Sequence, residues 1–158
     1  MPSRRDQIKM RDEELEAFLV EQRIVQVVSF GPNGRPHLMP LWYIPDVFEL
    51  RGWTYAKSQK AKNLERDPRA TVGVDDGVAY HELRGVMMEC DVELVREPEQ
   101  VAEIGIALFE RYGGGTPGGE LAPEVAEMVR GQAEKRVGLH FVPTRTVSWD
   151  HGKLGGAY

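Results

Sequence analysis

The sequence predicts a mostly-β fold, an antiparallel barrel or curled sheet with helices inserted between its strands. Over residues 81–95 apolar and polar side chains alternate, as they do along an antiparallel strand with one solvated face. The pair Asn33-Gly34 stands between two apolar runs, which is the strongest short-range signal for a hairpin. The chain has 158 residues, with no internal repeat and no linker-like stretch, so we expect one domain over residues 1–158.

A short amphipathic helix is predicted after an arm at residues 1–11, which we expect to be flexible or to clasp a partner. Asp12 is a plausible N-cap, and the two glutamates after it suit the positive end of a helix dipole. The helix is expected to end near Gln22. Spacing at i, i+3 and i+4 predicts a buried face of Leu15, Phe18 and Leu19.

The next segment predicts a hairpin. Residues 24–30 are β-branched and apolar on both faces, which indicates a buried strand, and the turn at 31–34 leads into a second strand over 35–44. Pro36 and Pro40 have no amide proton, so the second strand must lie at a sheet edge or a bulge and leave part of itself unpaired. Pro45-Asp46 is then expected to turn the chain into a third strand over 47–55.

The rest of the chain continues this mixture of strands and helices. A short helix over 58–67 is expected to stop at Pro68, followed by a fourth strand over 70–74 and the long strand over 81–95. Pro98 and Pro123 start two further helices. A strand over 137–141 is expected to break at Pro143, before a last strand over 146–149. The buried helix residues are predicted to be Val101, Ile104, Leu108, Val125, Met128 and Val129.

Composition excludes several classes of protein. Hydrophobic residues make up 41% of the chain and charged residues 28%, with a formal net charge of −5, which argues against general binding to nucleic acids or membrane surfaces. There is no signal-like N-terminus and no apolar run of the length that spans a bilayer. The single cysteine, Cys90, excludes an intrachain disulfide and fits a cytoplasmic location. It alternates with core residues and is expected to be a small buried hydrophobe.

A basic island lies at the start of the short helix. Residues 54–69 carry five basic and two acidic side chains, in a chain that is acidic overall. Ser58 is a candidate N-cap, and the N–H groups that follow it form a ready site for an anion. Lys57 and Lys60 flank this helix end, and the hydroxyl of Thr54 lies within reach at the end of a strand. The competing interpretation is a solvated, charged helix face.

Three other patterns are assigned more cautiously. The stretch Gly113-x-Gly115-x-x-Gly118 has the letters of a dinucleotide fingerprint, but it follows a helix and contains a proline, so it is interpreted as a mobile loop. The four histidines are far apart, and no metal site is expected. An aromatic group is open to two interpretations, barrel core or a wall for a planar ligand. Its members are Trp42, Tyr43, Trp53 and Tyr55.

Three segments between residues 12 and 95, about half of the chain, together resemble a known family. The first runs from the helix at Leu15 through the hairpin to Trp42. The second is the start of the basic helix, with Thr54, Ser58, Lys60, Asn63-Leu64 and Asp67-Pro68-Arg69. The third is the strand over 70–76, continuing to Gly85. The segments resemble the pyridoxamine 5'-phosphate oxidase-like, FMN-binding split β-barrel family, and in particular its flavin- and deazaflavin-dependent oxidoreductases.

This resemblance implies a six- to seven-stranded antiparallel Greek-key split β-barrel. It also implies a homodimer, with two cofactor sites at the interface that both chains build. Lys60 would hold the cofactor phosphate, assisted by Ser58 and Thr54. Gln59 stands where many FMN-binding members have arginine, and the C-terminal segment lacks the arginines with which true pyridoxamine phosphate oxidases bind substrate phosphate. The flavin-like ring would lie along the second strand, near Leu38, Met39, Pro40, Leu41 and Trp42.

We therefore expect an oxidoreductase that transfers a hydride between the deazaflavin coenzyme F420 and a small organic substrate. Lys57 and Lys62 would contact the carboxylate-rich tail of the coenzyme, whereas Arg66 and Arg69 would be structural or lie at the dimer contact. The alternatives are an FMN-dependent oxidase or reductase and a non-catalytic flavin- or haem-binding carrier. The helices over 98–135 are expected to shape the substrate side. Candidates for a proton donor are Tyr80, His81 and Tyr55.

Overall fold

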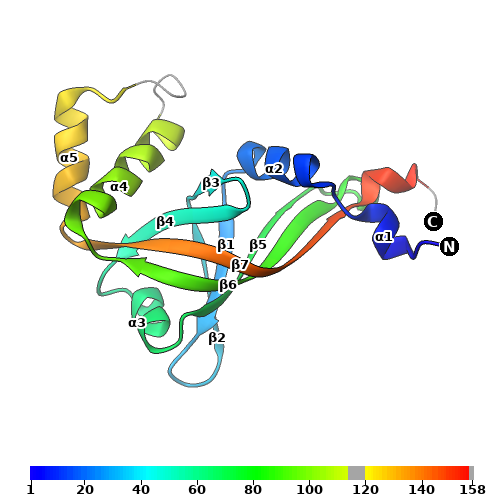
Figure 1. Cartoon of the computed structure of the whole chain (residues 1–158), viewed down its shortest axis with the longest axis horizontal. Helices are drawn as coiled ribbons and strands as arrows, with labels where there is room; N and C mark the ends of the chain where they lie inside the picture. The colour runs from blue at the N-terminus through cyan, green and yellow to red at the C-terminus, as the bar shows by residue number, and fades with distance from the viewer. Residues whose placement is uncertain (114–119, 157–158) are drawn as a thin grey trace.

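The structure, a computed structural model, describes residues 1–113 and 120–156. Within these residues, seven strands form one antiparallel sheet in the order β2-β1-β5-β6-β7-β4-β3 (Figure 1). The strands are β1 (Val25–Phe30), β2 (Pro36–Leu41), β3 (Ile44–Asp46), β4 (Glu49–Tyr55), β5 (Arg69–Asp76), β6 (Arg84–Val95) and β7 (Arg136–Asp150). The helices are α1 (Arg4–Ile8), α2 (Asp12–Glu21), α3 (Gln59–Arg66), α4 (Pro98–Tyr112) and α5 (Pro123–Ala133), with two 3₁₀ turns, η1 (Tyr80–Glu82) and η2 (His151–Leu154).

The two edge strands of the sheet are neighbours in the sequence. β2 ends at Leu41 and β3 begins at Ile44, so only Trp42 and Tyr43 join one edge to the other. Three Cα steps span at most about 11 Å, and the two edges must therefore approach each other. The sheet curls toward a barrel, but in the described chain β2 and β3 do not pair. The predicted split barrel is confirmed, with seven strands.

The first hairpin is confirmed at the predicted turn. The Gly31 N–H donates to the Arg35 carbonyl over 2.9 Å, and Gly34 adopts a φ of 78°, which favours glycine. β2 pairs with β1 alone, as the two prolines require. β1 itself is buried on one face only, since Gln26 and Phe30 are exposed. The prediction of a strand buried on both faces was therefore wrong.

The main core fills the concave side of the curled sheet, with α2 lying across it (Figure 1). The predicted α2 residues Leu15, Phe18 and Leu19 are all buried there. β6 contributes alternate side chains, as its period predicts, and Cys90 is among the buried ones. α4 and α5 pack on the opposite side of the sheet, with Val101, Ile104 and Leu108 buried as predicted. This division leaves α3 to close one end of the barrel.

Several local predictions need correction. The expected arm contains the helix α1, because Ser3 and Asp6 form a capping box at its start. Asp12 is the first residue of α2 and not its N-cap, a position that Arg11 occupies. Pro45 and Asp46 lie in β3, and the chain turns one residue later at Val47, whose φ is 56°.

The C-terminal part differs from the prediction at two points. Pro143 does not end a strand, because β7 runs on to Asp150 and the ladder with β6 shifts register beside Glu89 and Cys90. This irregularity absorbs the missing amide proton of the proline. Met128 of α5 is 52% exposed and does not pack inward. Residues 114–119 of the predicted glycine loop and residues 157–158 of the tail lie outside the described residues.

No helix within residues 1–113 and 120–156 is both long enough and apolar enough to cross a bilayer.

Candidate cofactor site

The start of α3 forms a polar cradle at the end of β4. Ser58 is the N-cap, as predicted, and its hydroxyl accepts the N–H of Ala61 over 3.1 Å. The hydroxyl of Thr54 lies 3.2 Å from that of Ser58. The amides of Gln59 and Lys60, the first two helical residues, have no acceptor within the helix. The cradle therefore combines free donors with the positive end of a helix dipole.

Lys60 is the unusual member of this cradle. Only 6% of the residue is exposed, and within the described residues no hydrogen bond or ion pair reaches its ammonium group. Burial lowers the pKa of Lys60 below its usual 10.5, because desolvation disfavours the charged form. Partial desolvation of a cation without an anionic partner costs free energy. Lys60 therefore places a cation at the start of α3 that no carboxylate of the described residues neutralises.

Polar contacts hold α3 against β1. Asn63 is fully buried and donates to the Ser29 hydroxyl over 3.1 Å. Gln59 donates to the Asn63 side-chain oxygen over 2.8 Å, and Arg66 donates to the carbonyl of Phe30 over 2.6 Å. Arg66 therefore has the structural role expected for it. These bonds fix the direction in which the start of α3 faces.

The other basic residues of the island divide into two groups. Lys62 lies 3.7 Å from Glu65 and is 54% exposed, and Arg69 pairs with Asp67 over 2.7 Å. Lys57, in contrast, is exposed and makes no ion pair within the described residues. The structure thus leaves Lys57 available at the helix start and gives Lys62 a partner of its own.

The predicted ring-contact segment, residues 38–42, follows the free edge of β2. Met39 pairs with Val27 and Leu41 with Val25, so these two side chains point to the core face of the sheet. Leu38 and Pro40 point to the other face, because side chains alternate along a strand. Within one chain, the five residues therefore do not form a single surface. Leu38, Met39 and Trp42 are about half exposed, at 57%, 47% and 47%.

The four aromatic residues noted in the sequence do not gather at one place. Tyr43 belongs to the core, where its hydroxyl donates to the Leu19 carbonyl over 2.6 Å. Trp53 and Tyr55 share the other face of β4, where Trp53 packs against α4 and Tyr55 lies beside Arg136. Trp42 instead stacks on Tyr112, the last residue of α4. Sequence reasoning missed Tyr112, since nothing in its local pattern points to a contact 70 positions away.

Comparison with known proteins identifies the family. A family model described as pyridoxamine 5'-phosphate oxidase matches residues 11–133, more than half of the chain. This chain belongs to that family. A search of curated proteins found no match.

Solved structures of similar fold include proteins whose names differ widely. A conserved hypothetical protein of Mycobacterium tuberculosis, Rv2991, is 40% identical with a TM-score of 0.88, covering 99% of this chain and 95% of that one. An F420 reductase is 23% identical, with a TM-score of 0.62 and coverages of 83% and 94%. HutZ, a heme storage protein of Vibrio cholerae, is 16% identical, with a TM-score of 0.67 and coverages of 90% and 99%. The last two likenesses show the fold alone.

In this family member, two of the three proton-donor candidates lie away from the cradle. α3 leads directly into β5, a strand of eight residues, and Tyr80 and His81 follow its far end. They pack against η2, where the Tyr80 ring contacts His151. Within one chain, only Tyr55 is near Ser58. The structure does not bring the three candidates together.

His37 is a further residue that sequence reasoning passed over. It faces Ser29 across the β1–β2 ladder, and Ser29 is bonded to Asn63 of α3. The Nδ1 atom of His37 is buried and has no hydrogen-bond partner within the described residues. His37 is therefore a buried polar group near the middle of α3 that lacks a partner among the described residues.

Proposed function

We propose that this chain is an oxidoreductase that binds a phosphate-bearing flavin-type cofactor at the start of α3, and that this cofactor is the deazaflavin coenzyme F420. The observation that carries the proposal is Lys60, a residue only 6% exposed at a helix N-terminus, whose ammonium makes no hydrogen bond or ion pair within the described residues. Membership of the pyridoxamine 5'-phosphate oxidase family supports it. So does the structural likeness to an F420 reductase.

Each group of the cradle has a definite role in this proposal. The ammonium of Lys60 pairs with the phosphate, and the amides of Gln59 and Lys60 donate to its oxygens. The hydroxyls of Ser58 and Thr54 complete the set of donors. The coenzyme supplies the hydride chemistry, so the protein has to bind it, orient its ring and exclude water. That division of labour requires no cluster of catalytic acids and bases.

The proposed site includes a second copy of the chain. β2 is an edge strand that pairs with β1 on one side and, within the described residues, with no strand on the other, and it carries half-exposed apolar side chains. Such edges are normally covered in proteins. A partner chain that covers this edge would close the site along residues 36–42. Sedimentation equilibrium should then give twice the chain mass of 17.8 kDa. A monomer that binds the coenzyme with full affinity would contradict this part of the proposal.

The decisive experiment is a fluorescence titration with F420 and, in parallel, with FMN. Lys60→Met should weaken the binding of the preferred cofactor by about 1.5–3 kcal/mol, the usual loss for a charged hydrogen bond, or about 10- to 150-fold. Arg130→Met is the control, because Arg130 of α5 is half exposed and pairs with Glu99 away from the cradle, and it should change affinity less than about twofold.

The outcomes separate the parts of the proposal. Equal affinity in the wild type and Lys60→Met would remove the phosphate site at α3. Tight binding of FMN without detectable binding of F420 would keep the site and replace the coenzyme. No binding of either cofactor by the wild type would contradict the proposed site and leave, among the alternatives, a haem-binding carrier.

A further inference from the structure

The turn between α5 and β7 meets the start of α3. The N–H of Ala56 donates to the carbonyl of Lys135 over 2.9 Å, and Tyr55 faces Arg136 in the β4–β7 ladder. Two cations that lie outside the basic island of the sequence, Lys135 and Arg136, therefore stand beside the loop that carries Lys57. The sequence separates these residues by nearly 80 positions, so no local pattern links them.

Aromatic rings hold the guanidinium of Arg136 in place, but no carboxylate in the described part of the chain neutralises its charge. Its guanidinium carbon lies 4.2 Å from the ring centroid of Tyr55 and 4.5 Å from that of Trp53. The one hydrogen bond found for it is a long contact of 3.5 Å to Gln132. Its Nε atom is buried without an acceptor, and no carboxylate pairs with it in the described part of the chain.

The cations around α3 divide by the end of the helix at which they lie. At the C-terminal end each is satisfied by the protein, since Glu65 pairs with Arg96 over 2.6 Å and also with Lys62, and Asp67 pairs with Arg69. At the N-terminal end none has a carboxylate partner within residues 1–113 and 120–156. That second group is Lys57, Lys60, Lys135 and Arg136.

The geometry also separates Arg136 from the phosphate position of Lys60. Thr54 is buried and contributes its hydroxyl to the cradle, whereas the next residue, Tyr55, is exposed on the opposite face of β4. Arg136 shares the face of Tyr55. A phosphate bound on the face of β4 that carries Thr54 would therefore not pair with Arg136, which lies on the opposite face.

We propose that Arg136, with Lys57 and Lys135, forms a second anion subsite, and that the ligand carries a second anionic group beyond its phosphate. This inference rests on the proposed function and narrows it to ligands with an anionic extension. A carboxylate or a phosphate fits the planar donor fork of an arginine. Two sources share this chemistry: the carboxylate-rich tail of F420 and the second phosphate of FAD.

The test is a series of titrations with riboflavin, FMN, FAD and F420. Arg136→Gln should weaken the binding of F420 or of FAD by about tenfold, as expected for one charged hydrogen bond, and that of FMN by less than twofold. Arg136→Lys keeps the charge and should restore part of the loss. Arg130→Gln is the control, because Arg130 of α5 pairs with Glu99 and lies outside the cluster. If Arg136→Gln weakens the binding of F420 alone, the group at the second subsite is a carboxylate of the coenzyme tail. If it weakens the binding of FAD, that group is the second phosphate.

Two results would overturn the inference. One is an Arg136→Gln variant that binds all four ligands as the wild type does. The other is an equal loss for FMN and the longer ligands, which would indicate a general effect on the fold. A urea unfolding curve of each variant shows whether that effect is present. A different result would show that the proposed phosphate site is wrong, namely a Lys60→Met variant whose affinity for FMN is unchanged.

Discussion

The rings of Trp42 and Tyr112 stack with centroids 4.6 Å apart and planes inclined by 7°. Trp42 lies in the two-residue connection between the edge strands β2 and β3, and Tyr112 is the last residue of α4. The Tyr112 hydroxyl lies 2.8 Å from the carbonyls of Tyr43 and Arg23 and accepts the Tyr43 N–H. The inserted helix α4 is thereby fixed across the gap in the barrel.

Tyr112→Phe should lower the free energy of unfolding by about 1–2 kcal/mol, because it removes the hydroxyl and leaves a backbone N–H without its acceptor. Urea unfolding monitored by circular dichroism measures this. Tyr55→Phe is the matched control. Its hydroxyl makes no hydrogen bond within the described residues, so the change should be below about 0.5 kcal/mol. Equal effects of the two substitutions would show that the Tyr112 hydroxyl contributes nothing.

Lys60→Met should make the ligand-free protein more stable while it weakens cofactor binding. In the sequence Lys60 is a candidate phosphate ligand, with a solvated helix face as the competing interpretation. The structure shows a residue that is only 6% exposed and has no hydrogen bond or ion pair within the described residues. Methionine removes the desolvated charge and keeps an unbranched side chain of similar length. The substitution should therefore raise the free energy of unfolding by about 1 kcal/mol. A lower urea midpoint for Lys60→Met would mean that an unidentified anion already stabilises the wild type.

The same lysine predicts a pH dependence. Burial holds the pKa of Lys60 below 10.5 in the folded state, so the cost of its charge is present below the folded pKa. That cost is relieved as pH rises through the folded pKa toward the unfolded value. The stability difference between Lys60→Met and the wild type should therefore shrink with rising pH, and the wild type should bind its cofactor more weakly. Parallel unfolding and titration series from pH 7 to 10 measure both effects.

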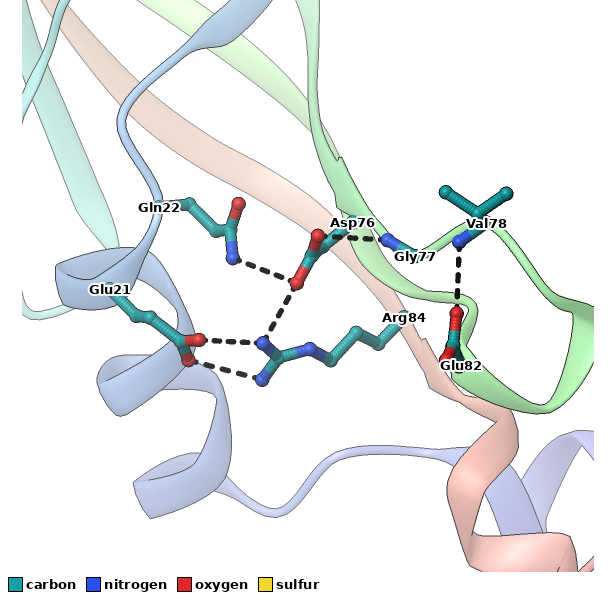
Figure 2. A network of polar contacts seen from close by, with 7 residues as sticks. All are labelled: Glu21, Gln22, Asp76, Gly77, Val78, Glu82 and Arg84. Carbon is teal, nitrogen blue, oxygen red and sulfur yellow. Dashed lines mark hydrogen bonds and ion pairs between the residues drawn. The ribbon is translucent and has the colours of Figure 1, made fainter.

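Arg84 links α2 to the ends of β5 and β6, as Figure 2 shows. It donates to both carboxylate oxygens of Glu21, over 3.1 and 2.6 Å, and to Asp76 over 2.8 Å. Arg84→Met should lower the free energy of unfolding by about 1 kcal/mol, within the range of partly exposed ion pairs. A double-mutant cycle with Glu21→Gln separates this coupling from the packing of Arg84 over Phe18. A cycle without coupling energy would exclude the ion pair as the cause.

The contact between Arg84 and Asp76 also predicts how the free energy of unfolding changes at acidic pH. The hydrogen bond from Arg84 is the main cause that holds the pKa of Asp76 below 3.8. A depressed carboxyl pKa contributes stability above the unfolded pKa, and this contribution is lost as pH falls through the folded value. The difference between the wild type and Arg84→Met should therefore be constant near pH 6 and decrease below about pH 4.

Two glycines offer a matched pair for the contact between α4 and the sheet. A Cβ at Gly105 would lie 2.3 Å from the Trp53 ring and 3.0 Å from Val129, so Gly105→Ala should destabilise by about 1–3 kcal/mol through overpacking. A Cβ at Gly131 in α5 would meet nothing within 4 Å. Gly131→Ala should therefore stabilise by about 0.5–1 kcal/mol, the helix preference for alanine. Thermal unfolding distinguishes the opposite signs, and the same sign for both would contradict the packing at Gly105.

Predictions from the sequence were most accurate where a structural feature depends on neighbouring residues. The hairpin at Asn33-Gly34 follows from the backbone angles that glycine permits. The edge position of β2 follows from prolines that cannot donate to a ladder. The cap at Ser58 and the alternation along β6 are local in the same sense. Prediction failed at Pro143, because the bulge that accommodates it belongs to the pairing with another strand.

For the candidate site, too, the sequence predicted the local features and only the tertiary structure showed the rest. By itself, the sequence determined that a basic helix start follows a strand, with Ser58, Lys60 and Thr54 at that end, because cap geometry is encoded within a few residues. Only the tertiary structure decided that Lys60 is a buried residue with no partner among the described residues, that Lys62 pairs with Glu65, and that Arg136 lies beside Tyr55. Burial and pairing depend on which elements pack together. In this sheet β1 pairs with β5 and β4 with β7, contacts between distant segments that local spacing does not encode.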